Sequence, residues 1–334
     1  MTVASLRKEQ AAPAADDLPM SGGVTLPAIP NEEAAAGRKL PQVKLPSGRL
    51  LFEAFWPPAA GILGFIGVWA LLAPMVQTSL GALPGPGDVW DAFKGLMVEF
   101  SAARAEALAA EASGQTYSGP PTFIDQILTS LKTVAMGFIL ASLIAVPLGL
   151  VAGMSKRFNA AINPLIQIMR PISPLAWLPI VTMVVSASVT SDDPTLPKSF
   201  VISAIVVMMC SLWPTLINTA VGTASIDKDL INVGRVLKLG WFARLTKLVL
   251  PASLPYIFTG MRLSLGVGWM VLIAAEMLAQ NPGLGKFVWD EFQNGNEKSL
   301  ARIMVAVVVI GLIGVMLDRI MMAIQAVASR NRTV

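Results

Sequence analysis

The 334-residue sequence contains no histidine and a single cysteine, Cys210, which lies within an apolar run. Histidine is the usual acid–base group near neutral pH, and histidine and cysteine are the ligands of structural zinc sites. One cysteine cannot form an intramolecular disulfide. These absences exclude histidine-based catalysis, a Cys/His zinc site and a fold held together by disulfides.

Charge is also scarce. Lys, Arg, Asp and Glu make up 14% of the residues, apolar residues make up 54%, and mean hydropathy is +0.64. A soluble domain carries about 25% charged residues. The sequence therefore predicts a membrane protein with several spans. The net charge of +4 does not indicate nucleic-acid binding, because most basic residues lie between apolar segments and so indicate topology.

The N-terminal 50 residues are rich in Ala, Pro and charge, and we predict a disordered cytoplasmic tail over 1–50. The first long apolar stretch, 57–76, supplies the roughly 20 residues needed to cross hydrocarbon. Because this stretch begins so late, we expect it to be the first span and not a cleaved signal peptide.

Residues 77–121 are too polar to span a membrane and are predicted to lie on its outer, periplasmic side. Within them, 88–112 has the periodicity of an amphipathic helix. Its large apolar side chains fall near one face: Trp90, Phe93, Leu96, Met97 and Phe100. Such a helix either rests on the membrane surface or forms part of a docking surface for an external partner, and the two interpretations can coexist.

Five further apolar segments bring the expected number of spans to six. They lie at about 127–153, 160–188, 200–221, 252–279 and 301–326. The membrane domain is predicted over 51–326, followed by a short cytoplasmic tail, 327–334.

Lysine and arginine are distributed unequally between the two sides of these spans. With six spans both termini lie on one side, and that side holds fifteen Lys and Arg residues against six on the other. Positive residues concentrate on the cytoplasmic side of a membrane. Both termini are therefore expected in the cytoplasm.

One short motif superficially resembles a phosphate-binding loop. Gly283-Leu284-Gly285-Lys286 contains a Gly-Lys pair, but the first glycine of such a loop is missing and Phe287 stands where Ser or Thr would hold magnesium. The motif also falls in a loop expected outside the cell, where no ATP is available. The chain itself is not expected to bind ATP, a metal or another cofactor.

The segment 222–250, between the fourth and fifth spans, is basic and expected in the cytoplasm. Asp227 can cap a helix there, and three apolar residues follow at helical spacing: Leu230, Val233 and Leu237. Gly240 suits a chain reversal, after which a second amphipathic turn leads to Pro251. A short exposed helix of this kind either fits a groove on a soluble partner or packs on its own bundle.

This segment resembles the EAA loop of binding-protein-dependent ABC importer permeases. Alignment on Leu250-Pro251 places Asn232-Val233-Gly234 at the Glu-Ala-Ala positions and Lys238 at the usual glycine. The spacing of the motif is kept, but its glutamate is absent. The resemblance assigns coupling to partner ATPases to these residues: Asp227, Asp229, Leu230, Asn232, Val233, Gly234, Arg235, Leu237, Lys238, Gly240 and Pro251.

The resemblance covers about 51–326 and is closest to the nitrate, bicarbonate, cyanate and sulfonate branch of these permeases. The runs that carry it are LPGP at 83–86, RPISPLAWLP at 170–179, SLWPTLINTA at 211–220, PASLPYIFTGMR at 251–262, AAEML at 274–278 and WD at 289–290. Within that branch, the runs at 213–220 and 255–260 look most like those of nitrate permeases.

The resemblance implies an all-α fold with about six transmembrane helices, the type I ABC importer (MetI-like) permease fold, in the bacterial inner membrane. It also implies two copies of the permease, two cytoplasmic ATPases that bind ATP and magnesium, and an external solute-binding protein or lipoprotein. The implied solute is a small oxyanion, nitrate or nitrite in the first place, with bicarbonate, cyanate and sulfonates such as taurine as alternatives. The chain would be a non-catalytic translocation subunit.

Five residues within the spans are candidates for the anion path: Arg170, Trp177, Asn218, Thr219 and Glu276. Arg170 lies about 10 residues, or ~15 Å, into the third segment, and a guanidinium can meet a planar anion with paired donors. The alternatives are structural. Arg170 pairs with Glu276 or caps backbone carbonyls, Trp177 packs, and Asn218 and Thr219 serve contacts between helices.

Two other charged residues, Lys132 and Arg262, are expected to extend toward the membrane interface. A secondary transporter driven by an ion gradient remains as a different class of protein. Such transporters commonly show inverted repeats and embedded carboxylates, and the sequence has no convincing repeat. A non-transporting scaffold is a third class, but it would have no use for the EAA-like loop.

Overall fold

The computed structural model describes residues 48–78, 81–115, 119–189, 197–296 and 298–330. The predicted tails, 1–50 and 327–334, lie mostly outside these ranges. At their edges the structure is helical, because α1 begins at Gly48 and α11 continues to Arg330. The chain divides into two units after Ala60, and the packing described below concerns 61–334.

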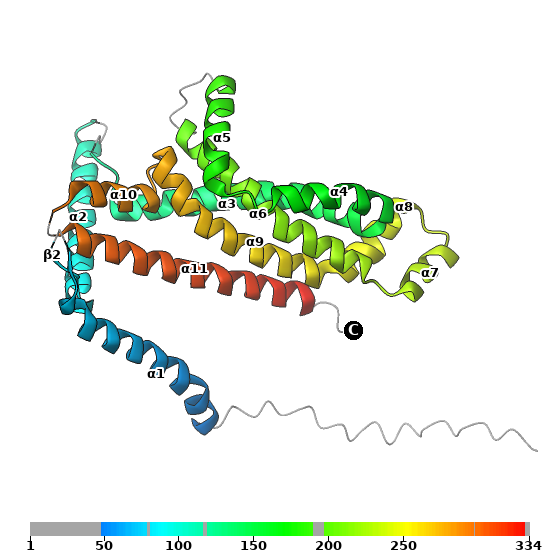
Figure 1. Ribbon diagram of the computed structural model, residues 1–334, viewed down its shortest axis with the longest axis horizontal. Coiled ribbons are helices and arrows are strands. Elements are labelled where there is room, and N and C mark those ends of the chain that lie inside the picture. Colours follow the sequence, from blue (N-terminus) through cyan, green and yellow to red (C-terminus); the bar gives the residue numbers. More distant parts are fainter. Residues whose placement is uncertain (1–47, 79–80, 116–118, 190–196, 297, 331–334) are drawn as a thin grey trace, which may run out of the picture. The chain divides into compact units, whose positions relative to one another are not determined.

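The described chain is almost entirely helical (Figure 1). A short antiparallel hairpin pairs Gln77 with Ala82 and Thr78 with Gly81. In chain order the elements are α1 (Gly48–Leu72), the 3-10 turn η2 (Ala73–Met75), β1 (Gln77–Thr78), β2 (Gly81–Ala82), α2 (Pro86–Ala112), α3 (Phe123–Met154), α4 (Lys156–Met169), α5 (Pro174–Ser188), α6 (Lys198–Ala224), α7 (Lys228–Val236), α8 (Trp241–Arg244), the π-helical segment η3 (Leu245–Val249), α9 (Leu250–Ala279), α10 (Leu284–Asn294) and α11 (Ser299–Arg330).

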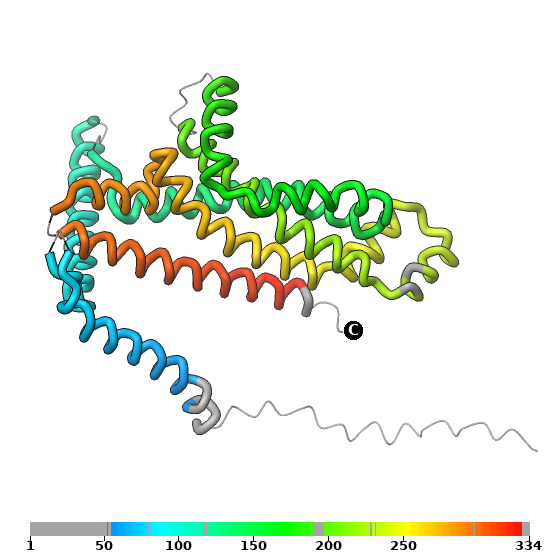
Figure 2. The backbone as a smooth tube through the Cα atoms, viewed as in Figure 1, coloured from blue at the N-terminus to red at the C-terminus, as the bar shows by residue number. Residues whose placement is uncertain are grey.

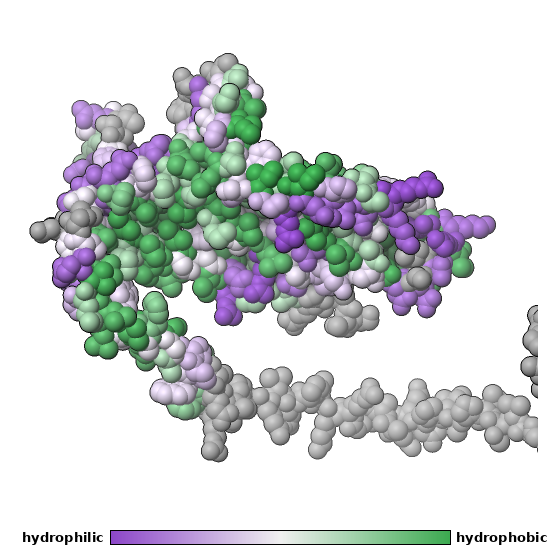
Figure 3. Space-filling view, in the orientation of Figure 1, coloured by the Kyte–Doolittle hydropathy of each residue, from purple (hydrophilic) through white to green (hydrophobic). Residues whose placement is uncertain are grey.

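The number of described helices that could cross a membrane, five or six, agrees with the six predicted spans and with an all-α architecture. Among the described residues, five segments are long and apolar enough: Phe55–Met75, α3, α6, Trp241–Ala279 and α11. A sixth crossing results if α4 and α5 are counted as one broken span. In Figure 3, hydrophobic side chains cover much of the middle of the bundle, and hydrophilic ones gather toward α2 and α7.

The third expected span, 160–188, is not one continuous helix. It consists of α4 and α5, which meet at a bend of 99° (Figure 2). Arg170 keeps helical backbone angles, but Pro171 after it lacks an N–H and cannot donate the next helical bond, and α4 ends at Met169. The Ser173 hydroxyl then caps α5 by accepting from the Leu175 amide at 3.3 Å.

The centre of the bundle is a three-helix unit in which α6 lies between α3 and α9. Three glycines of α3 let it approach α6 closely. A Cβ added at Gly137, Gly149 or Gly153 would lie 2.6, 2.6 or 2.4 Å from a side-chain atom of Val207, Thr219 or Thr223, respectively. Small residues at helix interfaces permit this approach in membrane proteins.

The α6–α9 contact combines glycine with buried hydroxyl groups. A Cβ at Gly260 would lie 2.9 Å from the Thr215 backbone. The Ser264 hydroxyl accepts from the Thr215 amide at 3.0 Å, lies 2.7 Å from the Thr215 hydroxyl, and donates to the carbonyl of Ser211. Gly260 and Gly268 therefore both allow close packing of α9 on α6.

The expected amphipathic helix at 88–112 is α2. Its apolar residue Leu96 is buried, and Phe93 and Met97 pack against the main hydrophobic core, whereas Trp90 is 60% exposed. Arg302, at the start of α11, holds α2 and α10 together: it donates to Glu99 at 2.5 Å and lies 3.1 Å from Glu291. The apolar face of α2 is thus largely used within this chain.

We predict that Gly260→Ala destabilises the protein and that Gly311→Ala does not. The added methyl group at 260 would overlap the α6 backbone, and overpacking of this kind costs about 1–3 kcal/mol. At 311, in the interior of α11, nothing lies within 4 Å of the added atom, and alanine favours a helix over glycine by about 1 kcal/mol. Thermal unfolding in detergent, followed by tryptophan fluorescence, measures both; equal melting temperatures would contradict the packing described.

Candidate functional site

The structure does not bring Arg170 and Glu276 together. Arg170 lies at the bend between α4 and α5, and its side chain is exposed. Glu276, near the end of α9, is fully buried and has other partners. The alternative in which these two residues pair is therefore wrong.

The Glu276 carboxylate joins three helices. The Ser130 hydroxyl of α3 lies 2.9 and 2.8 Å from its two oxygens, and the Gly285 amide, in the first turn of α10, donates to it at 3.0 Å. A helix N-terminus stabilises an anion at this position. A Cβ at Gly283 would lie 2.2 Å from the carboxylate, so only glycine fits there. These contacts support a structural role for Glu276, in which it fixes α10 against α3 and α9.

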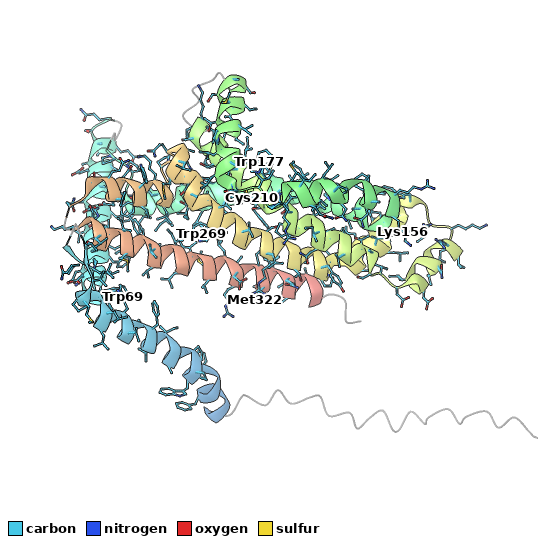
Figure 4. The ribbon with its side chains drawn as sticks, viewed as in Figure 1. Trp69, Lys156, Trp177, Cys210, Trp269 and Met322 are labelled. Carbon is cyan, nitrogen blue, oxygen red and sulfur yellow. The ribbon has the colours of Figure 1, made fainter. Side chains whose placement is uncertain are left out.

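The other three path candidates also lie in contacts between helices. Thr219 is fully buried on α6 against Gly149 of α3. Asn218 donates to the Pro214 carbonyl at 2.8 Å within α6, and a Cβ added at Gly260 of α9 would lie 2.8 Å from its side chain. Trp177, labelled in Figure 4, lies on α5 and packs against the hydrophobic cluster that α5 forms with α6 and α9. Of the five candidates, Arg170 alone has a charged side chain that is exposed.

The sequence analysis missed an ion pair between the membrane-spanning helices. Arg262 of α9 binds both carboxylate oxygens of Asp318 of α11; Nη2 donates to Oδ2 at 2.8 Å, and Nε donates to Oδ1. Arg262, which was expected to extend toward the membrane interface, is thus paired with a carboxylate of a neighbouring helix. Two residues of opposite charge in neighbouring spans were a usable signal, but sequence alone does not show that their helices turn these side chains toward each other.

The expected cytoplasmic helix is α7, and its beginning agrees with the prediction. The Asp227 side chain accepts from the Asp229 amide at 3.0 Å. Gly234, at the last of the Glu-Ala-Ala positions, faces inward, where an added Cβ would lie 2.7 Å from Leu248. Pro251 lies in the first turn of α9.

The chain reversal after α7 occurs at Lys238 and not at Gly240. Lys238 has φ +50°, and its amide donates to the Arg235 carbonyl at 2.9 Å, while the Leu239 amide donates to the Gly234 carbonyl at 3.0 Å. This pair of bonds is a Schellman C-cap, whose left-handed residue is usually glycine. Gly240 has φ −60° and precedes α8, a conformation that any residue adopts. The expected reversal at Gly240 is therefore wrong.

An apolar face of α7 is exposed. Val233, Val236 and Leu237 are 50%, 81% and 63% exposed, and with Asp229 and Asn232 they line a shallow cavity of 360 Å³. Leu230 is half-buried and Arg235 is exposed. Val236 was not among the predicted residues. Its position three residues after Val233 places it on the same helical face.

Among the described residues, no group of three or more His, Cys, Asp or Glu side chains could hold a metal ion.

We predict that Lys238→Gly stabilises the α7 hairpin by roughly 1 kcal/mol, because a non-glycine residue in the left-handed region costs about that much. Gly240→Ala is the control: its φ is negative and nothing lies within 4 Å of the added methyl, so no loss is expected. Hydrogen exchange of the α7 amides measures both. If Gly240→Ala lowered the protection of the α7 amides, the chain reversal would have to be placed at Gly240.

Residues 145–331 match the family described as "Binding-protein-dependent transport system inner membrane component". The chain is 39% identical to the nitrate import permease protein NrtB of Synechococcus elongatus over 195 residues, which are 58% of this chain and 66% of that protein, slightly less than two thirds. It is 34% identical to the bicarbonate transport system permease protein CmpB of the same organism over 275 residues, 82% of this chain and 89% of that protein.

Among solved structures, an inward-facing MetNI methionine ABC transporter matches with a TM-score of 0.52 at 13% identity, over 62% of this chain and 95% of that chain. At this identity the likeness concerns the fold, and it agrees with the MetI-like fold that was predicted. The family match spans more than half of the chain, and the chain therefore belongs to the family of binding-protein-dependent transport system inner membrane components.

Proposed function

We propose that the chain is the membrane-spanning subunit of an ATP-driven importer that carries nitrate across the bacterial inner membrane. Two copies would enclose the path, two cytoplasmic ATPases would bind ATP and magnesium, and an external solute-binding protein would deliver the anion. The proposal of nitrate is supported by the runs at 213–220 and 255–260, which look most like those of nitrate permeases. Identity to the nitrate permease is 39% over 195 residues, and identity to the bicarbonate permease is 34% over a longer stretch of 275 residues.

The observation that carries the ATP-driven mechanism is the exposed face of α7. Apolar side chains on a short helix that is expected in water are a common sign of a helix that binds in a groove of a partner. The opposite face of α7 is fixed on its own chain by the close approach of Gly234 to Leu248. A partner that binds Val233, Val236 and Leu237 would therefore move α7 together with the segment that leads into α9.

Alternating access needs a partner that contacts two conformations of the permease differently, because a ligand shifts an equilibrium only by its differential affinity. ATP binding and hydrolysis in the ATPases would supply that difference through α7. A gradient-driven transporter is less well supported, because its coupling ion would need a free buried carboxylate, and the Glu276 oxygens already accept bonds from Ser130 and Gly285.

Val236→Glu is expected to release the ATPases from the purified complex, because it would bury a charge in the apolar contact at a cost of several kcal/mol. Leu108→Glu is the matched control: Leu108 is 56% exposed on α2, the helix expected on the opposite side of the membrane. Co-purification of ATPase with tagged permease measures the effect. An intact complex in Val236→Glu would mean that the ATPases dock elsewhere.

Cells that carry this chain and its partners should take up labelled nitrate, and cells that lack this chain should not. Unlabelled nitrate should compete with the label, and bicarbonate and taurine should compete weakly or not at all. Bicarbonate is also a planar monoanion, but its O–H is a donor that a site made of donors leaves unpaired, and the sulfonate of taurine is tetrahedral. Competition by bicarbonate at equal concentration would assign the chain to bicarbonate. Uptake by the chain alone, without ATPases, would identify a secondary transporter.

A further inference from the structure

The ion pair between Arg262 and Asp318 lies far from the ends of its helices. Arg262 follows the first residue of α9 by 12 positions, and Asp318 precedes the last residue of α11 by 12 positions. At 1.5 Å per residue each is about 18 Å from that helix end. Both residues therefore lie within helices that are long and apolar enough to cross a membrane.

The pair is only partly covered by its own chain. The Arg262 and Asp318 side chains are 40% and 39% exposed, although charge in hydrocarbon is costly and charged side chains in spans normally face water or protein. Their exposed surface is therefore not expected to face lipid.

Two cavities adjoin the pair and contain room for a small ligand. One, of 240 Å³, lies between α9 and α11 and is lined by Trp269, Gly314 and Leu317 as well as by the pair; the other, of 490 Å³, lies along α9. Both are bordered by Gly266, where nothing lies within 4 Å of an added Cβ. The second cavity follows a stripe of α9 that is open along its length: Thr259, Leu263, Gly266 and Met270.

The bond geometry leaves part of the guanidinium free. Asp318 occupies the Nε–H and one N–H of Nη2. A guanidinium has five N–H donors, so the edge formed by Nη1 and Nη2 keeps three. A planar oxyanion can accept two parallel hydrogen bonds from such an edge.

We propose that this open stripe of α9 is a wall of the water-filled translocation path and that Arg262 binds the passing oxyanion with its free edge while Asp318 holds its other edge. The proposal rests on the anion importer function given above and adds the site. Asp318 orients the arginine and also weakens the anion's attraction to it. Weak binding suits a transport site, because the ion must leave as readily as it enters.

Chemical modification of a cysteine tests whether this face is wet. Because Cys210 is the sole cysteine of the chain, Cys210→Ala gives a cysteine-free background to which Gly266→Cys is added. In membrane vesicles that contain the whole permease–ATPase complex, a charged methanethiosulfonate reagent should modify this cysteine, and nitrate should slow the reaction. Leu143→Cys on α3, an apolar position 66% exposed, is the control and should stay unreactive.

Two further variants separate an anion site from a purely structural ion pair. Arg262→Lys keeps the charge pair but removes the forked edge, and the nitrate concentration that half-protects the cysteine should rise about tenfold, as for one lost charge-assisted hydrogen bond. Asp318→Asn removes the competing charge, and that concentration should fall. A structural ion pair predicts lower melting temperatures for both variants and no opposite shifts in protection.

An unreactive Gly266→Cys, or a reactive one that no anion protects, overturns the site, as would shifts of the same sign in Arg262→Lys and Asp318→Asn. Protection by bicarbonate instead of nitrate keeps the site and overturns the nitrate assignment. The uptake experiment in cells tests the importer function independently of these variants.

Discussion

The close approach of α6 to both α3 and α9 is the constraint on which the rest of the structure depends. Each contact is made at glycines whose replacement by any larger residue would overlap a neighbouring helix. Membrane helices gain little from hydrophobic burial against each other and associate through tight packing and hydrogen bonds instead. The buried hydroxyl groups of Thr215 and Ser264 add such bonds at the α6–α9 contact. This unit fixes the rotation of α9 about its own axis.

That rotation decides what each residue of α9 contacts. It turns Glu276 toward α3 and α10, Trp269 toward the Ile310 carbonyl of α11 at 3.0 Å, and Arg262 toward Asp318. The remaining stripe, with Gly266 and Met270, is left open. A single helix therefore presents an anchor near its C-terminal end, a charged group near its middle and an open surface beside that group.

Much of the fold could be predicted from the sequence, because membrane spans, amphipathic helices and basic loops each have a recognisable local pattern of apolar and charged residues. The spans around α3, α6, α9 and α11, the surface helix α2 and the capped helix α7 were all found in this way. The break between α4 and α5 was visible as Pro171 and Pro174, but the angle of the bend depends on packing. The left-handed Lys238 could not be foreseen, because the nearby Gly240 is the residue that intrinsic preference favours.

The candidate site was harder to predict, because its contacts join distant residues. Ser130 is 146 positions from Glu276, and Arg262 is 56 positions from Asp318. Whether two such residues meet depends on helix rotation, which sequence periodicity gives only coarsely. Arg170 was named as a candidate for its charge and its position within the third segment, whereas the ion pair that the packing of α9 and α11 creates was missed.

The continuity of α8, the π-helical segment and α9 has a mechanical consequence. Together they form one stretch of 39 residues from Trp241 to Ala279, roughly 58 Å long at helical rise. One end adjoins the α7 hairpin, the other is clamped by the Glu276 carboxylate, and Arg262 lies near the centre. A rigid-body tilt of this helical stretch by about 10° around its centre would displace its two ends by ~5 Å in opposite directions. The Arg262 guanidinium, near the centre, would hardly move.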